Sequence, residues 1–171
     1  MFASKTIKEL KIGDSESVSI TITEEHINAF AKATDDYNPL HMDSAYAAGT
    51  PFGARVAHGV LLTGIVSGIL GTKLPGLGTV AREMSAKFSN PAYIGDTVTA
   101  TIELVEIKER INMCTFKYTV VNQDGKLVVK GKAVVLPKNR ITGYNNTCIL
   151  VFLLTIARWF VTGFDIIFFL I

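Results

Sequence analysis

The spacing of apolar residues changes along the chain, and each spacing predicts a different element. Residues 7–22 alternate loosely between polar and apolar, which predicts one strand or a pair of short strands. Residues 23–34 place apolar side chains at helical spacing behind Thr23, a favourable N-cap, which predicts a helix that ends near Thr34. The following residues, 36–56, are rich in Asp, Asn, Pro and Gly. They predict a long connection of loop or short helix, and such connections are often functional.

Residues 58–71 are apolar almost all round, so a helix here is expected to be buried on most sides. Its glycines cost roughly 1 kcal/mol each against Ala, which indicates that something approaches the helix backbone closely. After this segment the spacing changes to two. Long strands are predicted over residues 80–88, 97–107, 112–122 and 127–136. This order of elements predicts an α+β fold, in which a mostly antiparallel sheet packs against one buried helix.

Composition narrows the class of protein. The 171 residues suit one domain with an appendage, and 17 basic against 15 acidic residues give a net charge of +2. That balance excludes a strongly basic nucleic-acid binder and an acidic disordered chain. The two cysteines, Cys114 and Cys148, form neither a disulfide framework nor a zinc motif. Without a recognisable signal peptide, the expected compartment is the reducing cytoplasm.

The net positive charge and many of the apolar residues lie in the last part of the chain. We therefore expect a domain over residues 1–137 and a hydrophobic extension of unknown role over residues 138–171. Residues 149–171 are long enough for a spanning helix, but Arg158 and Asp165 oppose insertion. Three interpretations remain open: a weak membrane anchor, a helix packed on a dimer, or an out-of-frame extension.

The candidate chemistry lies in residues 36–41, where Asp36 and His41 are five positions apart on a segment stiffened by Pro39. A carboxylate and an imidazole can share acid–base work around one bound water. Directly before the apolar helix, His58 precedes Gly59, and the first N–H groups of a helix can stabilise negative charge. The same residues are also compatible with a plain turn, with a surface His41 and with His58 as a packed residue.

Several motifs occur in a characteristic order: FAKATDDYNPLHMD at 30–43, YAAGTPFG at 46–53, VAHG at 56–59, SGILG at 67–71 and LPGLG at 74–78. Together they resemble the MaoC-like, (R)-specific enoyl-CoA hydratases, over roughly residues 7–137. One departure is Asp35, where many members of that family have Gly.

This resemblance implies a hot-dog fold, in which an antiparallel sheet wraps around a long central helix, and homodimers with active sites near the subunit interface. It implies Asp36 and His41 as the catalytic pair and Gly59 as the backbone donor to the thioester carbonyl. Asn38 would support the catalytic loop, and Ser67 and Leu70 would line the acyl pocket. The resemblance implies neither a metal nor a redox cofactor, since CoA is part of the substrate.

The expected function is therefore reversible syn hydration of a trans-2-enoyl-CoA to (R)-3-hydroxyacyl-CoA, and a short acyl chain is expected. Three alternatives stay open at this point: a dehydratase acting on acyl-carrier protein, a hot-dog thioesterase, and a non-catalytic dimeric binding module. An acyl-CoA is the expected small-molecule partner and a second copy of the chain the expected protein partner. No nucleic acid is expected, and membrane contact only through residues 149–171.

Overall fold

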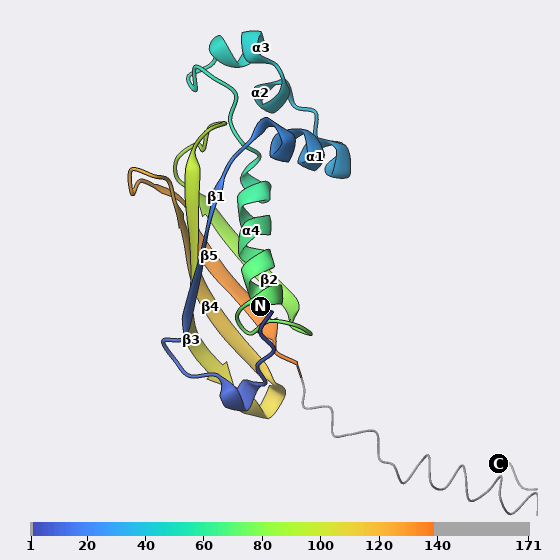
Figure 1. Cartoon of the computed structure of the whole chain (residues 1–171), viewed down its shortest axis with the longest axis vertical. Helices are drawn as coiled ribbons and strands as arrows, with labels where there is room; N and C mark the ends of the chain where they lie inside the picture. Colours follow the sequence, from blue (N-terminus) through green and yellow to red (C-terminus); the bar gives the residue numbers. More distant parts are fainter. Residues whose placement is uncertain (1, 139–171) are drawn as a thin grey trace, which may run out of the picture. The chain divides into compact units, whose positions relative to one another are not determined.

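One long helix lies along one face of a five-stranded antiparallel sheet (Figure 1). This computed structural model describes residues 2–138. The interpretations of the extension at 138–171 therefore fall almost entirely outside the described residues. Within the described part of the chain, no helix combines the length and the apolar character needed to cross a membrane.

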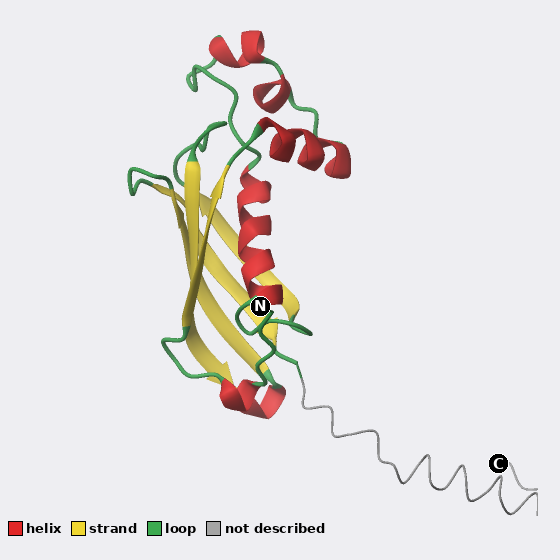
Figure 2. Ribbon diagram, viewed as in Figure 1, coloured by secondary structure: helices red, strands yellow, loops and turns green. Residues whose placement is uncertain are grey.

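The sheet has the strand order β1-β3-β4-β5-β2, and all pairs are antiparallel. Its strands are β1 (Ser15–Thr21), β2 (Val80–Phe88), β3 (Thr97–Lys108), β4 (Met113–Val121) and β5 (Leu127–Leu136). The helices are α1 (Glu24–Thr34), α2 (Pro39–Met42), α3 (Ser44–Ala48) and α4 (Gly59–Thr72), with short 3₁₀ turns η1 (Ile7–Glu9) and η2 (Glu109–Ile111). Figure 2 shows α1, α2 and α3 grouped beyond the end of the sheet at which α4 begins.

The core forms between α4 and the inner face of the sheet. Alternate residues of the strands point inward, which is the period that an extended backbone imposes. The buried set includes Leu62, Val66, Ile69 and Leu70 of α4, Val98, Ala100, Ile102 and Leu104 of β3, and Cys114, Phe116, Tyr118 and Val120 of β4. Burial raises the pKa of the Cys114 thiol to about 12, so this side chain behaves as a small apolar group.

The fold that the sequence predicts, an antiparallel sheet with a long helix against it, is confirmed, with one difference. Residues 7–22 give a single strand, β1, which is one of the two predicted outcomes, preceded by the turn η1. Helix α4 is buried on one side only. Val60, Gly64, Ser67 and Gly68 are exposed, because a single sheet covers one face of a helix and no described element covers the other.

The two edges of the sheet differ in character. β1 lines one edge, where its hydroxyl side chains bond to those of β3: Ser17 to Thr101, Ser19 to Thr99 and Thr21 to Thr97, at 2.8–2.9 Å. β2 lines the other edge and is exposed along nearly its whole length, including large apolar residues at both ends, Val80 and Phe88. An edge strand of this kind is open to pairing with another chain.

Gly131 of β5 has no room for a larger side chain. An added Cβ atom would lie 1.8 Å from the Ser85 carbonyl oxygen and 2.7 Å from the Tyr118 hydroxyl. The same hydroxyl donates a hydrogen bond to the Ser85 carbonyl at 2.8 Å. Gly131→Ala should therefore lower the free energy of unfolding by about 1–3 kcal/mol, the usual range for overpacking, as measured by urea unfolding. Gly49→Ala, where the nearest atom is 3.4 Å away, is the matched control, and an equal loss in both variants would contradict this reading.

Candidate active site

The loop after α1 presents a carboxylate, and its shape follows from local backbone geometry. Asp35 ends α1 in the left-handed conformation, with φ of 60°, which reverses the chain. Glycine adopts this conformation most readily, which explains why glycine suits position 35. Asp36 follows with its carboxylate half exposed, and its Oδ1 accepts a hydrogen bond from the Asn38 N–H at 3.3 Å.

Asn38 supports this loop as the N-cap of α2. Its Oδ1 accepts a hydrogen bond from the Leu40 N–H at 3.0 Å, and Pro39 occupies the first helical position, where a missing N–H is harmless. The capped turn carries His41 one position before the end of α2. The geometry at Asn38 is therefore consistent with the supporting role that the sequence indicates.

His41 is held on both its ring and its backbone. Its Nδ1 lies 2.8 Å from the Val56 carbonyl oxygen, so Nδ1 carries the proton and Nε2 is left as the reactive ring nitrogen. Its own carbonyl oxygen accepts a hydrogen bond of 2.6 Å from Nε of Arg55. Arg55 also forms an ion pair of 2.8 Å with Glu24, which ties α2 to the start of α1.

His58, the residue before α4, is almost fully buried, with 2% of its surface exposed. Its Nε2 lies 3.0 Å from the backbone carbonyl oxygen of Asp36 and must donate, because a carbonyl only accepts. Its ring packs against His41, with centroids 4.0 Å apart, and against Phe30 at 4.8 Å. Burial lowers the pKa of His58 below its usual value, so the ring is neutral near pH 7.

The carboxylate and the two imidazoles converge. One ligand atom from each of Asp36, His41 and His58 lies within 4.8 Å of the others. A single water can bridge a carboxylate and an imidazole over this distance. Each histidine directs one ring nitrogen to a backbone carbonyl, Nε2 of His58 to Asp36 and Nδ1 of His41 to Val56, and keeps the other nitrogen available.

Helix α4 begins beside these side chains. Among the described residues, the N–H groups of Gly59 and Val60 have no hydrogen-bond acceptor, as expected for the first turn of a helix. A side chain at Gly59 would collide with the Phe88 ring, since its Cβ would lie 2.7 Å from Cε1. The glycine therefore permits close approach of β2, and the helix start offers donors for a developing negative charge.

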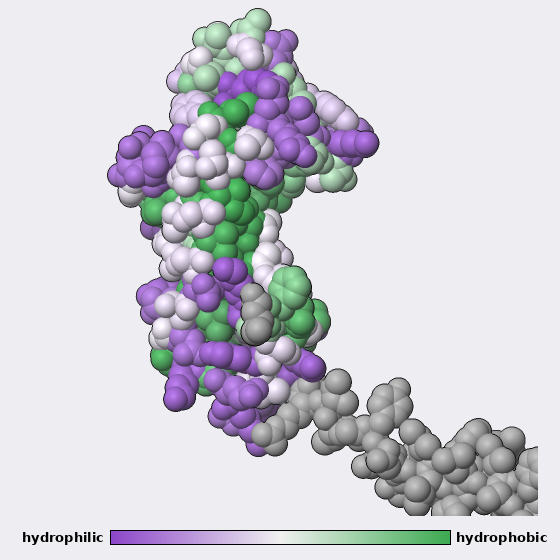
Figure 3. Space-filling model, viewed as in Figure 1, coloured by the Kyte–Doolittle hydropathy of each residue, from purple (hydrophilic) through white to green (hydrophobic). Residues whose placement is uncertain are grey.

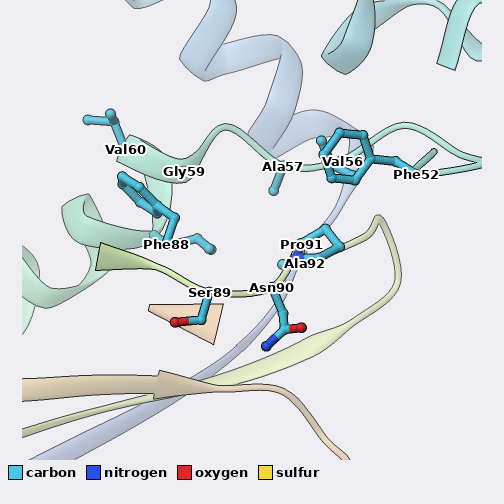
Figure 4. Close-up of a pocket in the computed structure, with 11 residues that line it drawn as sticks. Phe52, Val56, Ala57, Gly59, Val60, Phe88, Ser89, Asn90, Pro91 and Ala92 are labelled. Carbon is cyan, nitrogen blue, oxygen red and sulfur yellow. The ribbon is translucent and has the colours of Figure 1, made fainter. Parts of the chain in front are cut away.

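A pocket of about 470 Å³ opens at the same helix start (Figure 4). Gly59, Val60 and Phe88 line one side, and Phe52 and Pro91 line the other. The remaining lining residues are Val56, Ala57, Leu62, Ser89, Asn90 and Ala92. Such an apolar wall beside a few polar groups is typical of a site for a small organic ligand.

Two of the residues indicated by the sequence lie elsewhere on α4. Ser67 is exposed on the uncovered face of the helix, and Leu70 is buried in the core, so neither lines this pocket. Conversely, sequence reasoning did not single out Arg55, and it left His58 open as a packed residue. The nearness of His58 to Gly59 was the available signal, but its partner at Asp36 is visible only in three dimensions.

Comparison with known proteins identifies the family. Residues 10–125 match the family model described as the MaoC like domain. An (R)-specific enoyl-CoA hydratase of Rhodospirillum rubrum is 41% identical over 129 residues, which cover 75% of this chain and 89% of the relative. A mitochondrial 3-hydroxyacyl-[acyl-carrier-protein] dehydratase of Arabidopsis thaliana is 31% identical over 140 residues, which cover 80% of this chain and 82% of the relative.

Among solved structures, the (R)-hydratase of Aeromonas caviae involved in PHA biosynthesis superposes with a TM-score of 0.74 at 37% identity, covering 77% of this chain and 99% of that one. The fold and these similarities thus define a hot-dog-like hydro-lyase. The chain belongs to the MaoC-like family of hydratases and dehydratases.

The lowered pKa of His58 predicts a pH-dependent stability. The unfolded chain binds a proton on this ring near pH 6.5, whereas the folded chain resists it. The contribution of neutral His58 to the free energy of unfolding is therefore complete above pH 6.5. It is lost as the pH falls towards the pKa of the folded state, and the free energy of unfolding then changes by at most about 1.4 kcal/mol per pH unit.

Urea unfolding between pH 7.5 and 5.5 measures this slope. His58→Gln, which cannot titrate, should have a flatter profile than the wild type. A profile for His58→Gln as steep as the wild type would show that His58 is not the group responsible.

Proposed function

We propose that the protein reversibly hydrates trans-2-enoyl-CoA thioesters to (R)-3-hydroxyacyl-CoA, with short acyl chains preferred. The observation that carries the proposal is the convergence of Asp36 and His41 within 4.8 Å, next to the first turn of α4. The similarity to (R)-specific enoyl-CoA hydratases supports the substrate class and the configuration of the product.

In this scheme Asp36 and His41 hold one water between them. Asp36 acts as the base that removes a proton from this water, while His41, which carries a proton on Nε2 at this stage, orients the water and delivers that proton to C2. The proton gained by Asp36 then passes to Nε2 of His41, which restores both groups. One water is consumed: its oxygen bonds to C3, one proton ends on C2, and the electrons of the double bond form the new C2–H bond. Because both groups act from one side, the addition is syn. No metal or redox cofactor takes part.

The thioester carbonyl would bind at the start of α4. Its oxygen gains negative charge as the enolate forms, and the Gly59 N–H is a donor without a competing acceptor among the described residues. Donors fixed in advance by the fold stabilise such charge without reorganisation. The absent side chain at Gly59 also leaves room between the helix and Phe88.

The acyl chain and CoA need a path away from this centre. The apolar pocket at Gly59 and Phe88 is one arm of that path. The other would run along the exposed face of α4, which is lined by the small residues Gly64, Ser67 and Gly68, whereas Leu70 faces the core. That face becomes an enclosed channel only if a second body covers it.

We propose that this body is a second copy of the chain, in a homodimer. Two features of the described residues support it: the unpaired edge of β2 and the uncovered face of α4, where Gly64 and Gly68 have no atom within 4 Å of an added Cβ. Apolar residues form a band across the middle of the view in Figure 3, over α4 and the adjacent strands. Large apolar patches of this kind are usually covered in oligomers.

A second candidate function is dehydration of a 3-hydroxyacyl group carried by acyl-carrier protein. The similarity to plant enzymes of that name favours it, as does a row of exposed lysines on the outer sheet face. Lys87 and Lys130 lie directly opposite each other, as do Lys117 and Lys132, although like charges in register are unfavourable. An acidic carrier would be attracted to this row. Relative kcat/KM on matched acyl-CoA and acyl-carrier substrates separates the two candidates.

We further propose that residues 1–137 form the complete catalytic unit. Every side chain given a chemical role lies between Asp36 and Leu70, and the last strand, β5, ends at Leu136.

The catalytic assignment predicts the outcome of two substitutions. Asp36→Asn and His41→Asn should each lower the rate of crotonyl-CoA hydration by about 10²–10⁴-fold, the usual contribution of a general acid–base group. The measurement is the loss of enoyl-thioester absorbance, followed by chiral analysis for (R)-3-hydroxybutyryl-CoA.

His26→Asn is the control and should retain wild-type activity, because His26 lies on α1 and bonds to Thr23 at its cap. Near-normal turnover in either folded site variant would disprove the assignment. An (S) product would disprove the stereochemistry, and release of free CoA thiol would identify a thioesterase instead.

The dimer proposal predicts the effect of a charge on the exposed face of α4. Wild-type protein should sediment at twice the 18.6 kDa chain mass, whereas Gly68→Glu should sediment as a monomer that has lost most activity. Glu is a better helix former than Gly, so the helix itself should persist. Ala29→Glu, on the exposed side of α1, should remain dimeric. A dimeric, active Gly68→Glu protein would contradict an interface on this face.

A further inference from the structure

One short segment holds both members of the catalytic pair. In residues 55–58, Arg55 donates to the His41 carbonyl at 2.6 Å and Val56 accepts from the His41 ring at 2.8 Å. His58, at the other end of the segment, donates to the Asp36 carbonyl at 3.0 Å. The relative position of the two side chains is therefore set by the segment 55–58 and not by the loop that connects them.

The segment is itself anchored to the loop before β3. The Ala57 N–H donates to the Ala92 carbonyl at 2.7 Å, and Val56 forms an isolated bridge with Tyr93. Ala57 and Ala92 are both buried. His58 could thus move only if α4 or the loop before β3 moved with it. The segment 55–58 is therefore a firmer support than the exposed loop around Asp36.

The chemistry of His58 is hard to explain by packing alone. Its Nδ1 is buried without a hydrogen-bond partner among the described residues, an arrangement that destabilises a fold. A leucine would fill similar space without that cost. Capping of α4 does not account for the imidazole either, because its side chain makes no cap hydrogen bond. The contact that uses the imidazole is the one from Nε2 to Asp36.

We propose that His58 is a positioning residue for the acid–base pair. Through the Asp36 carbonyl and its ring contact with His41, it fixes the separation and orientation of the carboxylate and the reactive imidazole. This inference rests on the proposed hydratase function and deepens it, since it assigns the residue that assembles the pair. Arg55 performs the corresponding task for the backbone of His41.

The neutral state of His58 fits this role. Its ring touches that of His41, so a second charge there would oppose protonation of His41 during the reaction. The charged or titratable groups near it are Asp36, with Oδ2 at 4.0 Å, and His41, while the adjacent helix α1 contributes the uncharged Phe30. Burial keeps the His58 ring uncharged. His41 can therefore carry the proton during the reaction while His58 supports it.

Two substitutions at position 58 separate hydrogen bonding from packing. His58→Leu keeps an apolar filler and removes the donor, whereas the amide nitrogen of Gln can reach the place of Nε2. We expect kcat for crotonyl-CoA to fall by about 10²-fold in His58→Leu, the scale of a small misplacement of catalytic groups, with KM nearly unchanged. His58→Gln should recover most of this loss. His26→Leu and His26→Gln are the matched controls and should both retain wild-type kcat.

A double variant tests whether His58 acts through Asp36. In the Asp36→Asn background, adding His58→Leu should lower kcat little further, because the group it positions is already inactive. A second loss of about 10²-fold, equal to the single-variant effect, would mean that His58 acts independently and would overturn the proposal. Wild-type kcat in folded His58→Leu, or a His58→Gln as impaired as His58→Leu, would also overturn it.

A spectroscopic readout keeps this test apart from that of the proposed function. Nitrogen chemical shifts of the His41 ring and of the Asn38 amide should move in His58→Leu and stay near wild type in His58→Gln. If wild-type protein hydrates no enoyl-CoA, the proposed function is wrong, while these shifts still report whether His58 positions the pair. Unchanged shifts in folded His58→Leu would overturn the positioning role, whatever reaction the enzyme catalyses.

Discussion

The site depends on where helix α4 begins. The inner face of the helix is fixed on the sheet by Leu62, Val66 and Ile69, each at most 2% exposed. That packing sets the position of its first turn, and with it the N–H groups that have no partner inside the helix. The close approach of Phe88 to Gly59 brings the end of β2 to the same place. A fixed set of donors beside an apolar pocket is thus a direct consequence of core packing.

The proposed acid–base pair reaches this point through polar contacts rather than through the core. Asp36 and His41 lie on an exposed connection, which by itself would leave them mobile. The backbone and side chains of residues 55–58 bind that connection to the start of α4. These hydrogen bonds are part-buried, and the partial exclusion of water strengthens them. The same segment therefore joins the rigid and the exposed halves of the site.

Much of the fold can be predicted from the sequence, because an extended strand and an amphipathic helix impose different periods. The spacing of apolar residues places α1 and the strands β2 to β5 within a few residues, and the motif at residues 36–41 makes Asp36, Asn38 and His41 candidates for the site. Strand order and register do not follow from that spacing. Nor does the contact of His58, because its partner is a backbone carbonyl 22 positions away, and every residue has a backbone carbonyl. Burial of a lone histidine leaves no pattern in the sequence.

The residues on the uncovered face of helix α4 are not explained by contacts within one copy of the chain. Its apolar character all round would suit a helix surrounded by protein, yet the sheet covers only one side. Gly64 and Gly68 lie on the uncovered side, where each weakens the helix by roughly 1 kcal/mol relative to Ala. Nothing within the described chain offsets that cost. Small residues become useful when another backbone or a ligand must approach closely, so the exposed face of α4 is best understood as half of a contact that a second molecule completes.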